Sequence, residues 1–261
     1  MIQRRVLGRT GLLVTRLGFG AMELRGPRVW NGRAVTDAQA DALLNAVLDE
    51  GLNFIDTSPD YGLSEEFIGK YISSRRSEYV LATKCGCTLV DAGDHDETPH
   101  VWTRDNLLRN IEESLKRLRT DCVDILQLHN PAVEVVEENR LVDALIEIRG
   151  AGHAKFIAVS TALPQLPVYL GWGVFDTFQV PYSALERTHE DWITRIRGSG
   201  AGTIIRGGLA KGAVMSDSDS GYQSKLWHAA GLDEILNGMN RSEFMLRFTL
   251  SHPYVDTVIV G

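Results

Sequence analysis

Four side chains suited to acid–base chemistry follow or end apolar runs that are typical of buried strands. They are Asp56 after NFI, Tyr61 five residues later, Lys84 after VLAT, and His129 at the end of DILQL. A phenol has an unperturbed pKa near ~10, and a neighbouring ammonium lowers it by favouring the phenolate. A carboxylate fixes the lysine, and a histidine beside the phenol orients a carbonyl oxygen. Because no nucleophile or metal cage accompanies them, the set favours protonation of a carbonyl that receives a hydride from a cofactor.

Each residue also has an ordinary structural explanation when it is taken alone. Asp56 could cap a turn, Lys84 could be a solvated strand end, and His129 could be a core histidine with satisfied hydrogen bonds. Together they lie at one end of consecutive predicted strands, where burying them unpaired would be costly. Their convergence therefore indicates a site.

Eight short apolar runs predict the strands that position these residues. The runs cover residues 16–20, 53–57, 79–83, 123–129, 156–160, 176–180, 203–207 and 257–261. They are almost continuously apolar, as in parallel strands buried on both faces. Helices are predicted between them. Two have N-caps, at Thr36 (in a capping box with Gln39) and at Ser64, and the others begin at Thr103, run through 141–150, lie around 191–198 and start at Ser242.

The alternation of strands and helices predicts one domain, residues 1–261, with the α/β fold of a (β/α)8 TIM barrel and a β-hairpin over residues 4–14. The eighth predicted strand ends the sequence, so the loop and helix that normally follow it are absent from the sequence given. A disordered tail and a shortened chain both remain open.

Composition limits the classes of partner. The net charge is −7 with dispersed basic residues, which argues against nucleic acid and anionic membranes. No run of 18 apolar residues and no signal peptide are present, and three cysteines make no disulfide framework. We therefore expect a cytoplasmic protein with a small-molecule substrate. A monomer is slightly favoured, although surface composition does not decide the oligomeric state.

Ordered motifs along essentially the whole chain resemble the aldo-keto reductase family. They are LGRTGLLVTRLGFGAM, NFIDTSPDYG, LATKCG, DILQLHNP, AVST and FQVPYS. The resemblance implies an NADPH-dependent reductase of aldehydes or ketones, with Tyr61 as proton donor and Asp56, Lys84 and His129 as its partners. NADH is not excluded, because the family's basic residues for the 2′-phosphate follow strand eight.

The resemblance also implies cofactor contacts. Ser160 and Gln179 match positions that hold the nicotinamide carboxamide, and Thr161 stands where the family usually has asparagine. Arg206 replaces a tyrosine that stacks on the nicotinamide in many members; its guanidinium could stack too, or it could be a surface arginine. The loop 207–212 resembles the pyrophosphate-side loop, with contacts expected at Gly207, Leu209 and Gly212.

Other signals leave alternatives open. Trp30 and Trp102 are predicted to line an aromatic substrate pocket, or else to pack the loops together. The Cys85-Gly86-Cys87 pair does not predict a zinc site, and no metal site is expected. The acidic loop 90–100 is expected to be solvated, and the polar segment 213–240 to form a flap over the cofactor.

Two other functions compete with the reductase. A redox-sensing or scaffold subunit would bind the dinucleotide with little turnover. A Schiff-base isomerase or aldolase would use Lys84 as an amine nucleophile, but Lys84 beside Asp56 is expected to stay charged.

Overall fold

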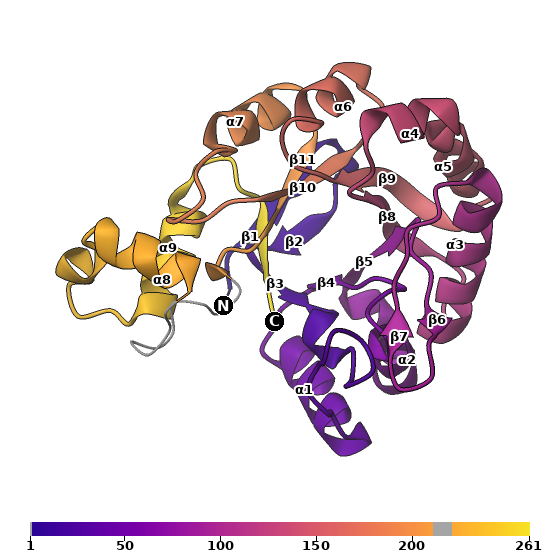
Figure 1. The fold of residues 1–261 in the computed structure, drawn as a ribbon, viewed down its shortest axis with the longest axis horizontal. Helices are drawn as coiled ribbons and strands as arrows, with labels where there is room; N and C mark the ends of the chain where they lie inside the picture. Colours follow the sequence, from indigo (N-terminus) through magenta and orange to yellow (C-terminus); the bar gives the residue numbers. More distant parts are fainter. Residues whose placement is uncertain (1, 211–220) are drawn as a thin grey trace.

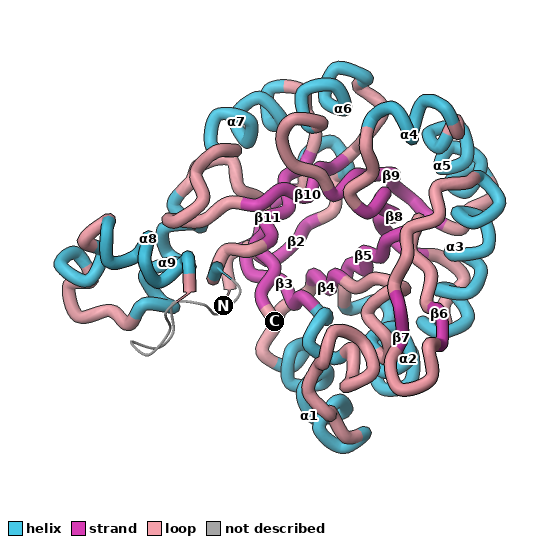
Figure 2. Tube along the Cα trace, viewed as in Figure 1, coloured by secondary structure: helices cyan, strands magenta, loops and turns pink. Residues whose placement is uncertain are grey.

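The computed structural model describes residues 2–210 and 221–261, and its centre is a closed barrel of parallel strands. The strand order around the barrel is β3–β4–β5–β8–β9–β10–β11–β12, and β12 pairs back onto β3. Figures 1 and 2 show the strands as an inner ring with helices outside it. The predicted (β/α)8 TIM barrel is confirmed.

The eight runs that were predicted to be barrel strands form them. Their bounds are β3 Leu17–Gly20, β4 Phe54–Asp56, β5 Val80–Cys85, β8 Val123–His129, β9 Ala154–Ser160, β10 Thr177–Pro181, β11 Gly202–Arg206 and β12 Thr257–Val260. Most of their residues are buried, because side chains on one face fill the barrel and those on the other pack under the helices.

An antiparallel hairpin closes one end of the barrel. The predicted hairpin is confirmed, with strands β1 (Arg4–Val6) and β2 (Leu13–Thr15), and its turn contains the short helix η1 (Gly8–Thr10). Leu7 and Val14 are fully buried in one apolar cluster with side chains of the barrel interior, among them Phe54. Gly202 begins β11 and lies against Leu7. The hairpin therefore covers the end where the strands begin, which leaves the other end for a site.

Helices lie between the strands. The described α-helices are α1 Asp37–Asp49, α2 Ser64–Tyr71, α3 Arg104–Leu118, α4 Val133–Glu138, α5 Leu141–Gly150, α6 Leu166–Trp172, α7 Glu190–Gly198, α8 Tyr222–Ala229 and α9 Arg241–Ser251; short helices are η2 Ala21–Leu24, η3 Ser73–Glu78 and η5 Leu232–Ile235. The Thr36–Gln39 capping box is confirmed, and so is the helix expected to begin at Thr103, which is its N-cap. The expected Ser64 cap is wrong: Leu63 is the N-cap, and Ser64 is hydrogen-bonded to Thr57 at 2.8 Å.

The segment that was expected to be a flap differs from the prediction. Residues 221–240 form α8 and η5 rather than a loop, and Trp227 of α8 is buried against Phe244 of α9 with ring centroids 5.8 Å apart. Figure 1 shows α8 and α9 side by side, outside the ring of strands. Residues 213–220 of the expected flap lie outside the described residues.

The acidic loop 90–100 is largely exposed to solvent, as expected, and it also contains secondary structure. It contains an antiparallel hairpin of β6 (Val90–Asp91) and β7 (Asp96–Glu97). Arg28 holds this hairpin through ion pairs to Asp91 at 2.7 Å and Asp96 at 2.6 Å. The acidic side chains therefore connect the loop after β5 to the loop after β3.

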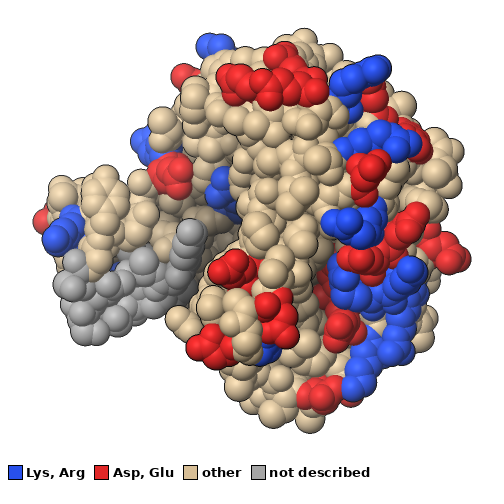
Figure 3. Space-filling view, turned by 45° about the vertical axis from the view of Figure 1, so that its right-hand side comes forward, with Lys and Arg blue, Asp and Glu red and all other residues tan. Residues whose placement is uncertain are grey.

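The surface carries no broad basic area on the face drawn in Figure 3, where acidic and basic side chains are intermixed. Among the described residues, none of the helices has the length and apolar character needed to cross a bilayer.

Candidate active site

The C-terminal ends of neighbouring strands bring the four predicted catalytic side chains together. Asp56 ends β4, Lys84 precedes the last residue of β5, and His129 ends β8. Tyr61 lies in the loop after β4. The Lys84 Nζ is 4.8 Å from the centroid of the Tyr61 ring, and the rings of Tyr61 and His129 meet edge to face with centroids 6.1 Å apart. The four residues are neighbours, while their roles in catalysis stay predictions.

The carboxylate of Asp56 is the centre of a hydrogen-bond network inside the barrel. Its Oδ2 accepts from the Nζ of Lys84 at 2.6 Å. Its Oδ1 accepts from the Nε2 atoms of Gln127 and Gln179 at 2.7 and 2.9 Å. Lys84 also donates to the backbone oxygen of Thr57 at 2.9 Å. Donors from three other strands or loops thus fix Asp56 and, through it, the ammonium beside Tyr61.

Burial and neighbouring charges shift the pKa values of Lys84 and Tyr61 in opposite directions. Burial lowers the pKa of Lys84, but the Asp56 carboxylate and other anionic neighbours raise it more, so the net pKa is raised and the ammonium stays charged. Burial raises the pKa of the Tyr61 phenol, and Lys84 offsets only part of this. The expectation that the ammonium brings Tyr61 below its ordinary pKa is therefore wrong for this structure, because burial outweighs the charge.

The loop that carries Tyr61 is shaped by its own backbone. The N–H of Tyr61 donates to the backbone oxygen of Ser58 at 3.0 Å and closes a turn. Gly62 follows with φ +45°, and a Cβ there would lie 2.2 Å from the backbone oxygen of Arg25. Only glycine fits this close approach. The sequence DYG therefore sets the phenol at the barrel end.

His129 lies among groups that the sequence analysis did not connect with it. Its Nδ1 is 3.3 Å from the Oδ2 of Asp60 and 2.9 Å from the Sγ of Cys87. Burial raises the pKa of Asp60, but His129 and a hydrogen bond from Ser58 lower it more, so the pKa of Asp60 is about 2. The ring of His100 lies edge to face with that of His129, with centroids 5.4 Å apart. Asp60 therefore orients the imidazole.

Three of the predicted cofactor-binding residues lie on or directly after the strands β9 and β10. Ser160 ends β9 and pairs in register with His129 on one side and Gln179 on the other. Thr161 follows Ser160, and all three predicted residues are buried. The Nε2 of Gln179 donates to the Oδ1 of Asp56 at 2.9 Å, which links this strand to the predicted catalytic residues.

The other predicted cofactor contacts lie at β11. Arg206 ends this strand, and its Nε is buried with no hydrogen-bond partner among the described residues. Its Nη2 lies 3.4 Å from the Oδ1 of Asn130, and burial lowers the pKa of the guanidinium. Gly207 (φ +71°) and Leu209 follow, and a Cβ on Gly207 would meet no described atom within 4 Å. Gly212 lies outside the described residues.

The two predicted substrate-pocket tryptophans have different surroundings. Trp30 is 48% exposed and lies edge to face with Tyr61, with centroids 6.1 Å apart, while its Nε1 donates to Thr98 at 3.2 Å. Trp102 lies against Gly86, where a Cβ would come within 1.8 Å of the indole. Trp30 thus contacts a predicted catalytic side chain, while the ring of Trp102 stacks on His100.

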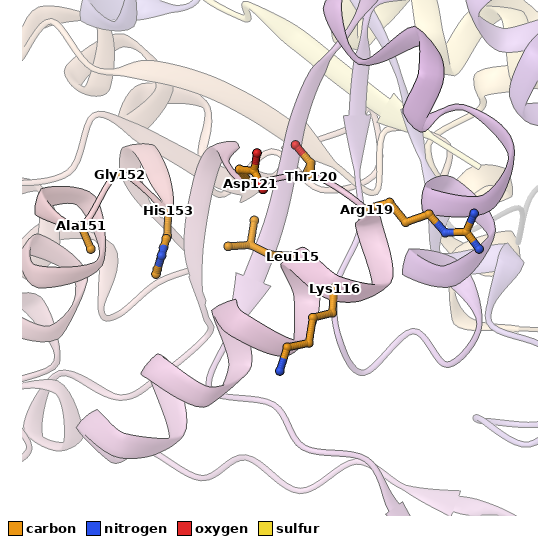
Figure 4. A pocket seen from close by; sticks show the side chains of 8 residues that line it. All are labelled: Leu115, Lys116, Arg119, Thr120, Asp121, Ala151, Gly152 and His153. Atoms are coloured by element: carbon orange, nitrogen blue, oxygen red, sulfur yellow. The ribbon is translucent and has the colours of Figure 1, made fainter.

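A cavity of about 540 Å³ lies elsewhere on the molecule. Figure 4 shows its lining, drawn from the end of α3 and from the turn before β9. Thr120 and Asp121 precede β8, and His153 precedes β9, so this cavity is at the end where the strands begin. It has no part in the site, since TIM barrels carry their chemistry at the other end.

Comparison with known proteins decides the family. A sequence model of the aldo/keto reductase family matches residues 16–261. The chain belongs to this family. The oxidoreductase YqkF of Bacillus subtilis (strain 168) is 26% identical over 280 residues, covering 100% of this chain and 87% of YqkF. The aldo-keto reductase YhdN of the same organism is 31% identical over 221 residues, covering 82% of this chain and 64% of YhdN.

A solved structure agrees with the sequence match. The holo form of an aldo-keto reductase from Bacillus halodurans has a TM-score of 0.85 and 28% identity, covering 99% of this chain and 85% of its own. Aldo-keto reductases are oxidoreductases that typically use nicotinamide cofactors. The resemblance found in the sequence motifs is confirmed, and it places this chain in an oxidoreductase family.

Proposed function

We propose that this aldo-keto reductase reduces aldehydes or ketones to alcohols with a nicotinamide cofactor, and that Tyr61 protonates the carbonyl oxygen. The observation that carries the proposal is the Lys84 ammonium, which is bonded to Asp56 at 2.6 Å and lies 4.8 Å from the Tyr61 ring. A charged donor held beside a phenol stabilises the phenolate that remains once the proton has left.

The residues of the site have separate roles in the proposed reaction. The carbonyl oxygen would be held between Tyr61 and the imidazole of His129, whose Nδ1 lies 3.3 Å from the Oδ2 of Asp60. Tyr61 is 9% exposed, so water competes little for its proton. When the nicotinamide is bound, it supplies the hydride that adds to the carbonyl carbon. Tyr61 then gives its proton to the oxygen, and solvent restores it.

The residues present fit a dinucleotide. The buried Nε of Arg206, which has no described partner, suits an anionic or aromatic group beside β11. Ser160, Thr161 and Gln179 would offer hydroxyl and amide groups to a carboxamide, and the backbone after β11 is open at Gly207. NADPH is the proposed cofactor, with NADH as the alternative.

A titration with each dinucleotide tests the proposal. Trp30 lies beside Tyr61, so tryptophan fluorescence should be quenched as NADPH saturates the site, and a Trp30→Phe variant should lose much of the signal while still binding. A panel of aldehydes and ketones then tests turnover by cofactor absorbance. Binding with no turnover would favour the redox-sensing or scaffold subunit. No binding of either dinucleotide would overturn the reductase proposal.

A further inference from the structure

Four side chains of the types that bind metals meet beside the proposed reductase site. They are Asp60, Cys87, His100 and His129, and one ligand atom from each lies within 4.8 Å of the others. The Sγ of Cys87 and the Oδ2 of Asp60 both face one atom, the Nδ1 of His129, at 2.9 and 3.3 Å. The proposed reduction uses His129 and its contact with Asp60, and it gives no role to Cys87 or His100.

The backbone sets two of these ligands side by side. Cys87 and His100 are partners in an isolated antiparallel bridge, and the N–H of Thr88 donates to the backbone oxygen of Pro99 at 3.0 Å. Directly opposite residues of an antiparallel pair project to the same face. His100 is fixed further by stacking on Trp102, with ring centroids 5.3 Å apart and an interplanar angle of 15°. The pairing therefore supplies half of a ligand set before any ion binds.

We propose that Asp60, Cys87, His100 and His129 bind one divalent ion of the zinc class. Thiolate, imidazole and carboxylate are the ligands that Zn²⁺ prefers, in a tetrahedral arrangement with Zn–N and Zn–O of about 2.0–2.2 Å and Zn–S of about 2.3 Å. Those bond lengths put neighbouring ligand atoms about 3.3–3.8 Å apart. The spacing in this structure, from 2.9 Å up to a limit of 4.8 Å, brackets that range.

Charge and access also suit such an ion. One carboxylate and one thiolate offset a double positive charge, with the thiol proton released to solvent on binding. Asp60 and Cys87 are buried, and His129 is partly buried, while His100 is exposed and offers a route of entry. A site at this position would place an ion on the Nδ1 side of His129, next to the reacting groups.

The neighbouring Cys85 is not a ligand, so the proposed site is not a simple C-x-C chelate. Cys85 is fully buried, and its Sγ contacts the backbone oxygen of Gln127 at 3.5 Å. It is not part of the cluster. The ligands therefore come from three loops and one strand end, and no short sequence spacing would reveal them.

The test measures metal binding by the full chain in the absence of dinucleotide. A negative result would therefore count against the metal site and would leave the reductase proposal untouched. Titration of the chelator-treated protein with Zn²⁺ in a calorimeter should give one equivalent of tight binding. Co²⁺ should give the visible bands of a four-coordinate ion and a thiolate charge-transfer band. Cys87→Ser should remove that band. His100→Gln should lower the affinity for Zn²⁺ at least ~100-fold, because loss of only the hydrogen bond that orients a metal ligand already lowers metal affinity ~10–100-fold.

Matched controls keep the test decisive. Cys122→Ser changes a cysteine outside the cluster, and His95→Gln changes an exposed histidine of the same hairpin; both variants should bind Zn²⁺ like the parent chain. Circular dichroism checks the fold of the Cys87 variant, because that side chain is buried. His100 is exposed, so its variant tests the site even if the Cys87 variant unfolds. No saturable binding, or binding unaffected by His100→Gln, would overturn the proposal.

Discussion

The Oδ2 of Asp56 lies 2.6 Å from the Nζ of Lys84, and both side chains are almost fully buried. Two charges removed from water are stable only while each has the other and their remaining hydrogen-bonding atoms are satisfied. The pair meets that condition through Gln127, Gln179 and the backbone oxygen of Thr57. The position of the ammonium beside Tyr61 therefore depends on Asp56.

Removal of one partner should destabilise the fold strongly. Asp56→Asn leaves the Lys84 ammonium buried without its counter-ion, and the free energy of unfolding should fall by about 3–5 kcal/mol. Urea denaturation measures this. The double variant Asp56→Asn/Lys84→Met should lose less unfolding free energy than the sum of the losses in the two single variants, because it leaves no unpaired charge. Asp37→Asn, which breaks an exposed ion pair with Lys70, should change the free energy of unfolding little. If the losses in unfolding free energy of the two single variants simply added in the double variant, the proposed coupling between Asp56 and Lys84 would be contradicted.

Removal of the phenolic hydroxyl should separate catalysis from binding. If Tyr61 is the proton donor, Tyr61→Phe should lower kcat for carbonyl reduction by about 10²–10⁴, the usual contribution of a general acid. The dissociation constant of the dinucleotide and the unfolding free energy should stay close to those of the parent. Tyr71→Phe, at a partly buried tyrosine of α2 outside the proposed site, is the control. A Tyr61→Phe variant that keeps most of its activity would rule out the assigned role.

The pH dependence of reduction should follow the raised pKa of Tyr61. Burial keeps the phenol protonated to higher pH than a free tyrosine, so the acid form is present throughout the neutral range. We expect kcat/KM for reduction to be independent of the Tyr61 titration below about pH 10 and to fall above it. Stopped-flow rates from about pH 6 to about pH 11, with unfolding monitored in parallel, measure the profile. A decline centred well below pH ~10 would show that burial does not dominate at this tyrosine.

The barrel and the four central residues could be predicted from sequence because each depends on a local pattern. A strand buried on both faces must be apolar throughout, as β8 (Val123–His129) nearly is, and a polar residue at its end then stands out. The same logic could have found Gln127, since an amide in the middle of an apolar strand needs a buried partner. That partner is Asp56.

The remaining features depend on contacts between distant segments. The edge-to-face contact of Trp227 with Phe244 joins α8 to α9, and the polar sequence before α8 gave no sign of it. Ser64 has the residue type of an N-cap, but its hydroxyl is used by Thr57 across the loop. The pairing of Cys87 with His100 spans a hairpin whose register no short motif specifies. These features follow from tertiary packing, which a residue pattern does not encode.

The last prediction concerns acid stability at the other end of β8. The Oδ2 of Asp124 accepts from Arg76 at 2.7 Å and from the N–H of Leu81 at 2.8 Å, and its Oδ1 accepts from Lys155 at 2.8 Å. Burial raises the pKa of Asp124, but these cations and donors lower it more, so the net pKa is lowered. A carboxyl whose pKa is lower in the folded state contributes stability above its unfolded pKa of about 3.9 and loses it as the pH falls through the folded value.

Asp124→Asn should therefore destabilise the protein most at neutral pH. The difference in unfolding free energy between the parent and this variant should narrow as the pH falls below about 4, because the carboxyl of the unfolded parent takes up a proton there while the native carboxylate does so only at lower pH. Asp121→Asn, three residues earlier and exposed, should give a small difference at every pH. Urea denaturation at a series of pH values measures both. A difference for Asp124→Asn that is unchanged across this range would show that the ion pairs with Arg76 and Lys155 do not stabilise the ionised form.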